Sequence, residues 1–260
     1  MSLSAAVTAR LLKEPILGLS RAKNTGLAVA RGRLLIFTDD DVTPCPRWLS
    51  AYWAAYQERP IGYFFGGPIE SEFDGQRPDP DLLRLAPCSV KGFDHGITAK
   101  LLGRHASFIG PNWACPVEIV RRVGGFDVRR GSNAIPGRVC AGEETHLMRQ
   151  LRRRGWRGWY LPEARLTHFV PLSKSAPQHI AMRCEAGAFD RAIAFPWSRN
   201  PKFARGLFIV ASFWAALWWV VWRLRGMSGA DTYAYIRWRG AVGWVAGFAE
   251  RLQSRHRDLD

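Results

Sequence analysis

The sequence predicts an open α/β sheet, followed by a helical C-terminal region that associates with a membrane. Residues 20–32 have the pattern of a helix, with Ser20 as its cap and Gly32 as its stop, and they lead into a short apolar run at 33–38. Three aspartates follow this run, and residues 47–57 are again helical in pattern. Helix, buried strand, acidic loop and helix in this order indicate an open α/β sheet, in which ligands bind beyond the carboxyl ends of the strands.

The chain between residues 63 and 169 continues this alternation of strands, loops and helices. The motif Gly66-Gly67-Pro68 interrupts an apolar run, and a segment rich in Pro and Asp is typical of a surface loop. We expect strands near 63–69, 157–161 and 166–169, helices over 116–123 and 143–154, a surface loop over 73–87 and a mobile loop over 126–142.

Residues 206–222 form a stretch of 17 residues without a charge, bounded by Arg205 and Arg223. A spanning helix needs about 20 apolar residues, with about 17 as the lower limit. Three tryptophans fall at four-residue intervals in this stretch, and tryptophan prefers the membrane interface. We therefore expect a helix embedded in a membrane or lying along it, with a buried core helix as the alternative. A second apolar stretch, 241–249, is too short to span.

The charge of the chain indicates which kinds of partner molecule it can bind. The net charge is +15, and residues 147–260 hold 19 Lys and Arg against 7 Asp and Glu, together with nine of the twelve tryptophans. A basic, tryptophan-rich region indicates an anionic surface, either a membrane or a nucleic acid. The five cysteines include no C-x-x-C pair, which argues against a zinc ribbon, a thioredoxin-type site and a disulfide scaffold, and favours a reducing, cytosol-facing environment. Residues 1–13 lack the pattern of a signal peptide.

Two groups of carboxylates are candidates for chemistry. The triplet at residues 39–41 follows a buried strand, and hard oxygen ligands at that position suit Mg²⁺ or Mn²⁺; the alternative is a solvated acidic turn. Glu143 and Glu144 open a helix about a hundred residues later. A carboxylate there can act as a general base, whereas the alternative is that both residues only stabilise the helix dipole.

A basic and polar segment before the acidic triplet, and one histidine, supply the other candidates. Arg21, Lys23 and Asn24 lie just before the acidic triplet and can meet a diphosphate, or they form an ordinary polar helix face. His168 follows a strand; a lone histidine is more often a hydrogen-bonded structural residue than a metal ligand.

Taken in order, these motifs resemble the family-2 glycosyltransferases of the GT-A fold, a Rossmann-like open sheet. The resemblance covers roughly residues 18–170. The stretches that carry it are GLSRAKNTGLAVARG (18–32), LLIFTDDDVTPCPRWL (34–49), GPNWACP (110–116) with VGGFD (123–127), AGEETHL (141–147) and YLPEARLTHF (160–169).

The resemblance implies a role for each matched position. One set would hold a divalent metal, Mn²⁺ or Mg²⁺: Asp39, Asp41 as the more direct ligand, and His168. A second set would bind the nucleotide-sugar and the acceptor: Arg21, Lys23, Asn24, Asp39, Asp40, Asn112 and Trp113. The last set is the acidic pair Glu143 and Glu144, with Glu144 as the catalytic base. With one base and no second carboxylate as nucleophile, we expect direct displacement with inversion.

The sequence departs from the family pattern at three places. Glu144 stands where the family usually has Asp, and His146 stands where it often has an acidic residue. The Q-x-x-R-W motif of polymer-extruding relatives is absent, because Arg154 follows Arg153, so we expect transfer of a single sugar. The family normally opens with a strand, a loop and a second strand, and none of the 38 residues before Asp39 has that pattern. We therefore expect an N-terminally incomplete sheet with an unpaired edge, poor donor binding and low solubility.

These observations predict a transferase with two parts. Residues 1–200 would form the GT-A-like domain and residues 201–260 an apolar, basic helical tail on the cytoplasmic face of the cell membrane, a bacterial inner membrane. The donor would be a UDP- or GDP-linked sugar, and the acceptor a glycan or a lipid-linked molecule. One alternative is a catalytically inactive, truncated relative that binds a membrane or a protein. A nucleic-acid-binding protein is the other, and we expect no nucleic acid because the chain has no signature of a known nucleic-acid-binding motif.

Overall fold

The computed structural model describes residues 9–133, 142–194, 201–226 and 228–257. In these residues the order of elements alternates helices and strands up to residue 170 and is helical afterwards. The strands are β1 Leu34–Phe37, β2 Val42–Pro44, β3 Tyr63–Gly66, β4 Ile69–Phe73, β5 Lys100–Leu101, β6 Trp113–Pro116, β7 Arg157–Tyr160 and β8 Leu166–Val170. The helices are α1 Leu19–Val29, α2 Trp48–Glu58, α3 Pro80–Leu85, α4 Cys88–Lys91, α5 Val117–Arg122, α6 Glu143–Arg153, α7 Leu172–Ser175, α8 Pro177–Ala194, α9 Pro201–Leu224 and α10 Ser228–Arg257.

The strands form two sheets. A five-stranded mixed sheet has the order β1-β6-β3-β7-β5, and a three-stranded sheet has the order β2-β8-β4. The chain passes from the larger sheet to the smaller one three times: through the acidic loop between β1 and β2, through Gly67 between β3 and β4, and between β7 and β8. A Cβ at Gly67 would lie 2.0 Å from the carbonyl oxygen of Ala164, so this crossing requires glycine.

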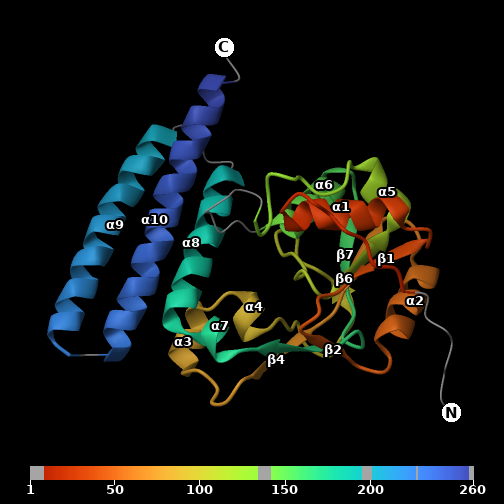
Figure 1. Cartoon of the computed structure of the whole chain (residues 1–260), viewed down its shortest axis with the longest axis horizontal. Coiled ribbons are helices and arrows are strands. Elements are labelled where there is room, and N and C mark those ends of the chain that lie inside the picture. Colours follow the sequence, from red (N-terminus) through yellow and green to blue (C-terminus); the bar gives the residue numbers. More distant parts are fainter. Residues whose placement is uncertain (1–8, 134–141, 195–200, 227, 258–260) are drawn as a thin grey trace.

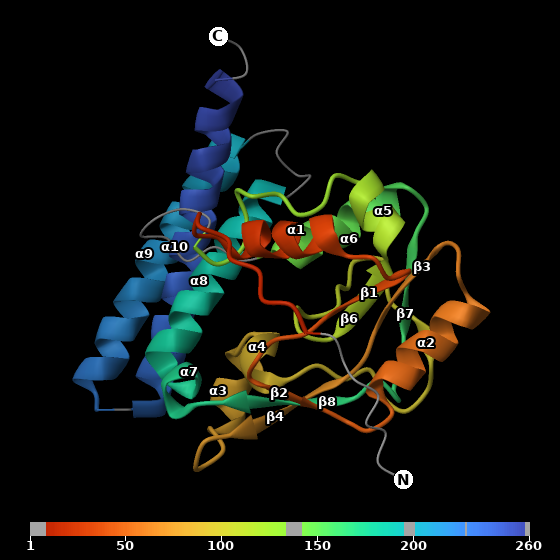
Figure 2. The same ribbon diagram turned by 45° about the vertical axis from the view of Figure 1, so that its right-hand side comes forward.

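Helices cover both faces of the larger sheet. Because successive side chains of a strand point to opposite faces, Trp113 and Cys115 of β6 pack in one buried cluster and Ala114 in another. The first cluster lies under α1, α5 and α6, and the second lies against α2 (Figure 1, Figure 2). β1 ends the sheet and pairs only with β6 in the described part of the chain, so its side chains are half-buried, where the sequence predicts a buried strand.

Three long helices form the C-terminal side of the molecule. Helix α10 lies between α8 and α9 and packs against both (Figure 1). Two glycines allow α10 to approach α8 closely: a Cβ at Gly243 would lie 2.2 Å from the carbonyl oxygen of Glu185, and one at Gly247 would lie 2.6 Å from that of Phe189. A third cluster, which includes Leu83 of α3, Ile180 of α8 and Ile236 of α10, joins these helices to the smaller sheet through Val170.

Most predicted elements are confirmed within a few residues, and three predictions are corrected. The first helix begins at Leu19 with Gly18 at the cap, and Ser20 is buried within it, its hydroxyl donating to the carbonyl of Arg130 at 2.7 Å. The predicted loop 73–87 contains helix α3, which Asp79 caps and Pro80 opens. Part of the predicted mobile loop, residues 134–141, lies outside the described residues. The alternative of a buried core helix at 206–222 is wrong, since no part of the apolar window in Arg205–Leu224 is buried.

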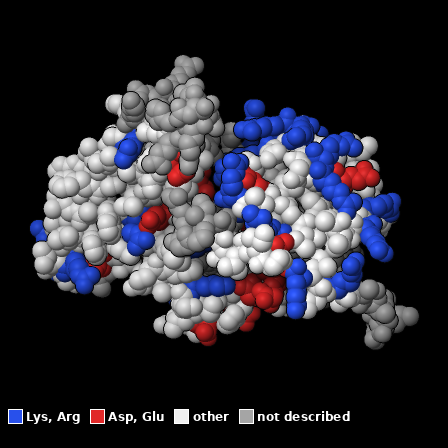
Figure 3. Space-filling view, turned by 45° about the horizontal axis from the view of Figure 1, so that its top comes forward, with Lys and Arg blue, Asp and Glu red and all other residues white. Residues whose placement is uncertain are grey.

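Charge is distributed unevenly over the surface. On the face shown in Figure 3, Lys and Arg side chains gather over the sheet-bearing half, and the half formed by the long helices is mostly uncharged. Exposed apolar side chains of α9 include Phe213, Trp214 and Trp218, each more than half exposed. In the described part of the chain, α9 is the one helix long and apolar enough to cross a membrane.

Candidate active site

The crossing between the two sheets brings Asp41 next to His168. In the smaller sheet Val42 pairs with His168, and the amide of Phe169 donates to the carbonyl oxygen of Asp41 at 2.9 Å. This register places the His168 Nε2 atom 3.4 Å from Asp41 Oδ2. Two predicted metal-binding residues, far apart in sequence, are thus neighbours because of strand pairing.

A lysine that the sequence analysis did not single out completes this group. The Lys174 Nζ atom of α7 donates to Asp41 Oδ2 at 2.8 Å. Partial burial would raise the pKa of Asp41, but this hydrogen bond and the charges of His168 and Lys174 hold it below its ordinary value. The other oxygen of Asp41, Oδ1, is buried and has no hydrogen-bond partner in the described residues. Asp41 therefore stays ionised with one acceptor atom unused.

Lys23 and the two glutamates form a second group, in which α1 meets the start of α6. Lys23 Nζ lies 3.0 Å from Glu143 Oε1 and also contacts Glu144, and all three side chains are nearly buried. Glycines make room for the carboxylates: a Cβ at Gly110 would lie 2.7 Å from Glu144 Oε1, and one at Gly131 would lie 3.1 Å from Glu143. One cation thus faces two carboxylates, and one excess negative charge remains.

The two glutamates differ in their affinity for a proton. Burial and the charge of Glu143 raise the pKa of Glu144 to about 7, although Lys23 opposes the shift. Burial would also raise the pKa of Glu143, but Lys23 and a hydrogen bond with Glu144 lower it below its ordinary value. Burial would lower the pKa of Lys23, and the charges of both glutamates raise it. The pair therefore holds an ionised Glu143 beside a Glu144 that exchanges its proton near neutral pH, as a general base requires.

Asp39 lies within electrostatic reach of both groups. Loss of hydration raises the pKa of its carboxyl, Lys23 opposes this rise, and the negative charge of Asp41 adds to it; His168 and Glu143 also act on it. Asp40 lies between Asp39 and Asp41 in the sequence, and its side chain is exposed. Asp39 thus links the Lys23–Glu143–Glu144 group electrostatically to Asp41 and His168, and the catalytic and binding roles of these residues stay predictions.

Two other predicted binding residues have structural roles in this arrangement. The amide of Asn24 donates to the carbonyl of Phe126 and accepts from its N–H, both at 2.8 Å, so its side chain ties α1 to the following loop. Arg21 lies beside Gly18 on the same helix and its charge acts on Glu14. The predicted contacts of Asn24 and Arg21 with the nucleotide stay predictions, and for Asn24 the geometry gives no support.

Asn112 is a core residue, which corrects the expectation that it binds substrate. Its Oδ1 atom accepts from Trp48 Nε1 and from the Tyr52 hydroxyl, both at 2.7 Å. Its Nδ2 atom donates to the carbonyls of Pro68 and Ala164, both at 2.8 Å. These four bonds use the full capacity of the amide. No part of its surface is exposed.

Trp113 is also fully buried, and its ring stacks on Phe37 with the centroids 4.4 Å apart. Its Nε1 atom has no hydrogen-bond partner in the described residues. The ring therefore supports the end of β1 from within the sheet, immediately before the acidic loop. Direct contact of Trp113 with a donor sugar stays a prediction.

The side-chain donor atoms at Asp41 and His168 fit a divalent cation whose remaining ligands come from a substrate. Asp41 Oδ1 is a buried carboxylate oxygen without a partner, and the imidazole of His168 adjoins the same residue. Carboxylate oxygen and imidazole suit Mn²⁺, and Mg²⁺ commonly takes one or two carboxylates and completes its shell with phosphates and water. Over the described ranges, no three His, Cys, Asp or Glu side chains are grouped closely enough to hold a metal by themselves. Diphosphate oxygens would have to supply the remaining ligands.

The fold and the site together are an open α/β sheet with an acidic loop, a histidine beside that loop and a buried pair of glutamates. Residues 9–124 match the family model described as Glycosyl transferase family 2. This match confirms, for that part of the chain, the resemblance that the motifs indicate. The match does not include the residues after 124, among them Glu143, Glu144 and His168. Only the folded structure places these residues at the site.

Among the solved structures, 53 chains are similar to this one, and two of them illustrate the likeness. One is the crystal structure of GalNAc-T7 with UDP, GalNAc and Mn²⁺, with 14% identity over 67% of this chain and 37% of that chain and a TM-score of 0.44. The other is mannosyltransferase PcManGT from Pyrobaculum calidifontis in complex with GDP-Man and Mn²⁺, with 19% identity over 92% of this chain and 67% of that one and a TM-score of 0.46. The chain thus spans little more than a third of the length of GalNAc-T7. No curated protein matches the sequence.

Proposed function

We propose that this chain transfers one sugar from a UDP- or GDP-linked donor to a glycan or lipid-linked acceptor, with inversion and with Mn²⁺ or Mg²⁺ as cofactor. The observation that carries the proposal is that Asp39 lies within electrostatic reach of two groups: Lys23 and Glu143, which adjoin the proton-exchanging Glu144, and the Asp41–His168 pair. A base and a cation site near one carboxylate correspond to the two needs of the reaction, deprotonation of the acceptor and departure of a diphosphate.

Each side chain has a part in this reaction. Asp41 and His168 would hold the cation, which when bound offsets the charge that develops on the leaving diphosphate. Lys174 lies at the same carboxylate and can bind a phosphate oxygen. Glu144 takes the proton of the acceptor hydroxyl, and the ionised Glu143 and Lys23 fix its position and its pKa. A single attack by the activated hydroxyl inverts the anomeric carbon.

We also propose that the protein works at the cytoplasmic face of a bacterial inner membrane. Helix α9 presents exposed tryptophan and phenylalanine side chains over a length sufficient to span. Arg205, Arg223 and Arg225 flank its apolar part. Each such arginine adds about 1 kcal/mol of attraction to anionic lipid.

The test is a binding titration of the full chain with UDP and with GDP, with and without Mn²⁺. The control is the double variant Asp39→Ala/Asp41→Ala. We expect weak nucleotide binding that requires Mn²⁺ and disappears in the control. Equal binding by the chain and the control, or none by either, would contradict the proposal and favour a catalytically inactive binding module.

The stereochemistry needs a separate measurement. An active preparation should give a product whose anomeric configuration is opposite to that of the donor, as read from the proton coupling of the anomeric centre. Retention would refute the single-displacement mechanism and leave the transferase assignment intact.

A further inference from the structure

Helix α9 presents an apolar face to the outside of the molecule. Val210, Trp214, Leu217 and Leu224 are exposed and follow one another at intervals of four, three and seven residues. Residues at these intervals lie on one side of an α-helix, here called the outer face of α9. Helix α10 packs along α9 and separates it from α8 (Figure 1). The outer face could meet lipid in two ways, because α9 could cross a bilayer or lie in the plane of its surface.

The contacts between α9 and α10 fix which of their residues lie at the same level. The ring of Phe208 stacks on that of Trp244 with the centroids 5.0 Å apart, and Trp219 stacks on Trp238 at 5.4 Å. The two helices therefore run antiparallel, and the middle of α9 lies beside residues 238–244 of α10. If α9 crossed a bilayer, the centre of that bilayer would be at this level.

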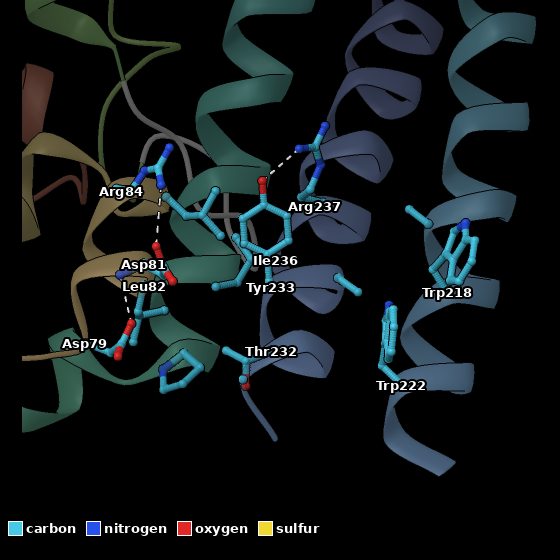
Figure 4. A pocket seen from close by; sticks show the side chains of 15 residues that line it. Asp79, Asp81, Leu82, Arg84, Trp218, Trp222, Thr232, Tyr233, Ile236 and Arg237 are labelled. Atoms are coloured by element: carbon cyan, nitrogen blue, oxygen red, sulfur yellow. Dashed lines mark hydrogen bonds and ion pairs between the residues drawn. The ribbon is translucent and has the colours of Figure 1, made fainter. Parts of the chain in front are cut away.

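Charged side chains of α10 and α8 lie close to the same level. Arg239 forms an ion pair with Glu185 of α8, and both side chains are about 30% exposed. One turn away, Arg237 donates to the Tyr233 hydroxyl at 2.9 Å; Figure 4 shows this bond on α10 and Trp218 on the neighbouring helix α9. A charged side chain near the centre of a bilayer is costly. A spanning α9 would therefore carry incompletely covered charges into the hydrocarbon.

The sequence of α9 also argues against a spanning position. Trp214 lies at the middle of Arg205–Leu224, where a spanning helix would hold its indole N–H in hydrocarbon, whereas tryptophan prefers the interface. Arg205 lies at one end of the apolar part, and Arg223 and Arg225 lie at the other. Basic residues that flank a spanning segment favour the cytoplasmic side. A helix in the surface keeps both ends on that side, whereas a spanning helix does not.

The charges of α9 favour lipid over a second copy of the chain as the partner of the outer face. The sequence of α9 contains basic residues and no acidic one. Two copies packed through this face would bring like charges together, Arg205 with Arg205 in a parallel pair or Arg205 with Arg223 in an antiparallel pair. Anionic phospholipid instead supplies the opposite charge at both ends of the helix.

We infer that α9 lies in the plane of the membrane surface, with its outer face inserted at the boundary between headgroups and acyl chains of an anionic bilayer. The helix is then an interfacial anchor that does not cross the bilayer. Helix α10, and α8 behind it, lie on the side of α9 that faces away from the lipid (Figure 1). This inference rests on the membrane association proposed above, which it makes more specific.

The test measures the depth of three positions on the outer face. A fluorescent amino acid replaces Val210, Leu217 or Leu224 by nonsense suppression, and the full chain is bound to vesicles of phosphatidylglycerol and phosphatidylcholine. Nitroxide-labelled lipids then quench the fluorescence from near the headgroup or from near the end of the acyl chain. Val210 and Leu224 are 14 residues apart, which is about 21 Å along a helix axis. An in-plane helix holds the three positions at one shallow depth, whereas a spanning helix holds them at different depths.

We expect equal quenching at the three positions, stronger from the headgroup label than from the chain-end label. A position at Leu217 that is markedly deeper than that at Leu224 would overturn the inference and leave the proposed membrane association intact. A chain that binds no vesicles would overturn both. The Mn²⁺-dependent titration with UDP and GDP tests the transferase reaction separately, since it needs no lipid.

Two double variants test the outer face itself. Val210→Glu/Leu217→Glu should weaken vesicle binding at least about tenfold, because it places two charges in the inserted face. The matched control, Ile61→Glu/Ile97→Glu, adds the same charges at exposed apolar positions of the sheet-bearing half and should bind within about twofold of the unmodified chain. Equal losses in the two variants would overturn the inference. A dimer in sedimentation without vesicles, abolished by Val210→Glu/Leu217→Glu, would identify a second copy as the partner and would also overturn it.

Discussion

The raised pKa of Glu144 predicts how the rate depends on pH. With a pKa of about 7, half of the Glu144 side chains carry the charge that a base needs at pH 7 and only about a tenth at pH 6. The rate, kcat/KM for the acceptor, should therefore fall about tenfold per pH unit below pH 6 and level off above pH 8. Glu144→Gln should lose on the order of 10²- to 10⁴-fold at every pH. The assay is the initial rate of nucleotide release from a UDP- or GDP-linked sugar between pH 5.5 and 8.5.

The two neighbours of Glu144 give opposite shifts and so test its identity as the titrating group. Removing the negative charge in Glu143→Gln should lower the pKa and move the profile to lower pH, whereas Lys23→Met should move it to higher pH. Because the folded chain holds the Glu144 proton more tightly than the unfolded chain, its contribution to stability falls as pH rises from about 4.5 toward 7. Glu144→Gln should accordingly melt at a higher temperature than the unmodified protein at pH 8. A flat rate profile, or identical profiles for both neighbour variants, would refute the assignment of Glu144 as base.

Three further changes give distinct outcomes. The Lys174→Met variant should bind Mn²⁺ about fivefold more tightly than the Lys174→Arg variant, because a partly exposed ion pair at Asp41 is worth about 1 kcal/mol. The affinities are measured by a spin-resonance titration of free Mn²⁺. Equal affinities would show that Lys174 does not compete with the cation for the Asp41 carboxylate. Asn112→Ala should lower the free energy of unfolding by at least about 2 kcal/mol in a urea titration, because buried partners lose their bonds; an intact stability with a raised KM would instead restore its predicted role in binding. Gly67→Ala should cost about 1–3 kcal/mol by overpacking, and Gly103→Ala, with open space around it, should change little; similar melting temperatures for both would contradict the close approach at Gly67.

The sequence predicts the parts of this fold that local pattern determines. The helix before β1, β1 itself, α2 and α6 lie within a few residues of their predicted positions, because apolar periodicity and glycine stops act over short distances. The acidic loop was identifiable for the same reason. Helix α3 was missed because a segment rich in Pro and Asp resembles a loop, although Asp79 followed by Pro80 is also a helix start.

The residues that were misjudged are those whose roles depend on distant parts of the chain. Asn112 binds partners at Trp48 and Tyr52, and no local pattern indicates that its amide is enclosed. Lys174 reaches Asp41 because β2 pairs with β8 and the chain then turns into α7. A lone lysine between two prolines gives no signal of such a contact. Contacts that span 44 to 64 residues for Asn112 and 133 residues for Lys174, not local propensity, decide both positions.

The glycines of α10 have a consequence for how the long helices can move. Gly243 and Gly247 leave no space between α10 and α8, so the two helices cannot slide past each other without steric overlap. Helix α8 begins next to Lys174, and α10 packs along α9. The three long helices should therefore move as one unit, together with the segment that carries Lys174 and its contact with Asp41.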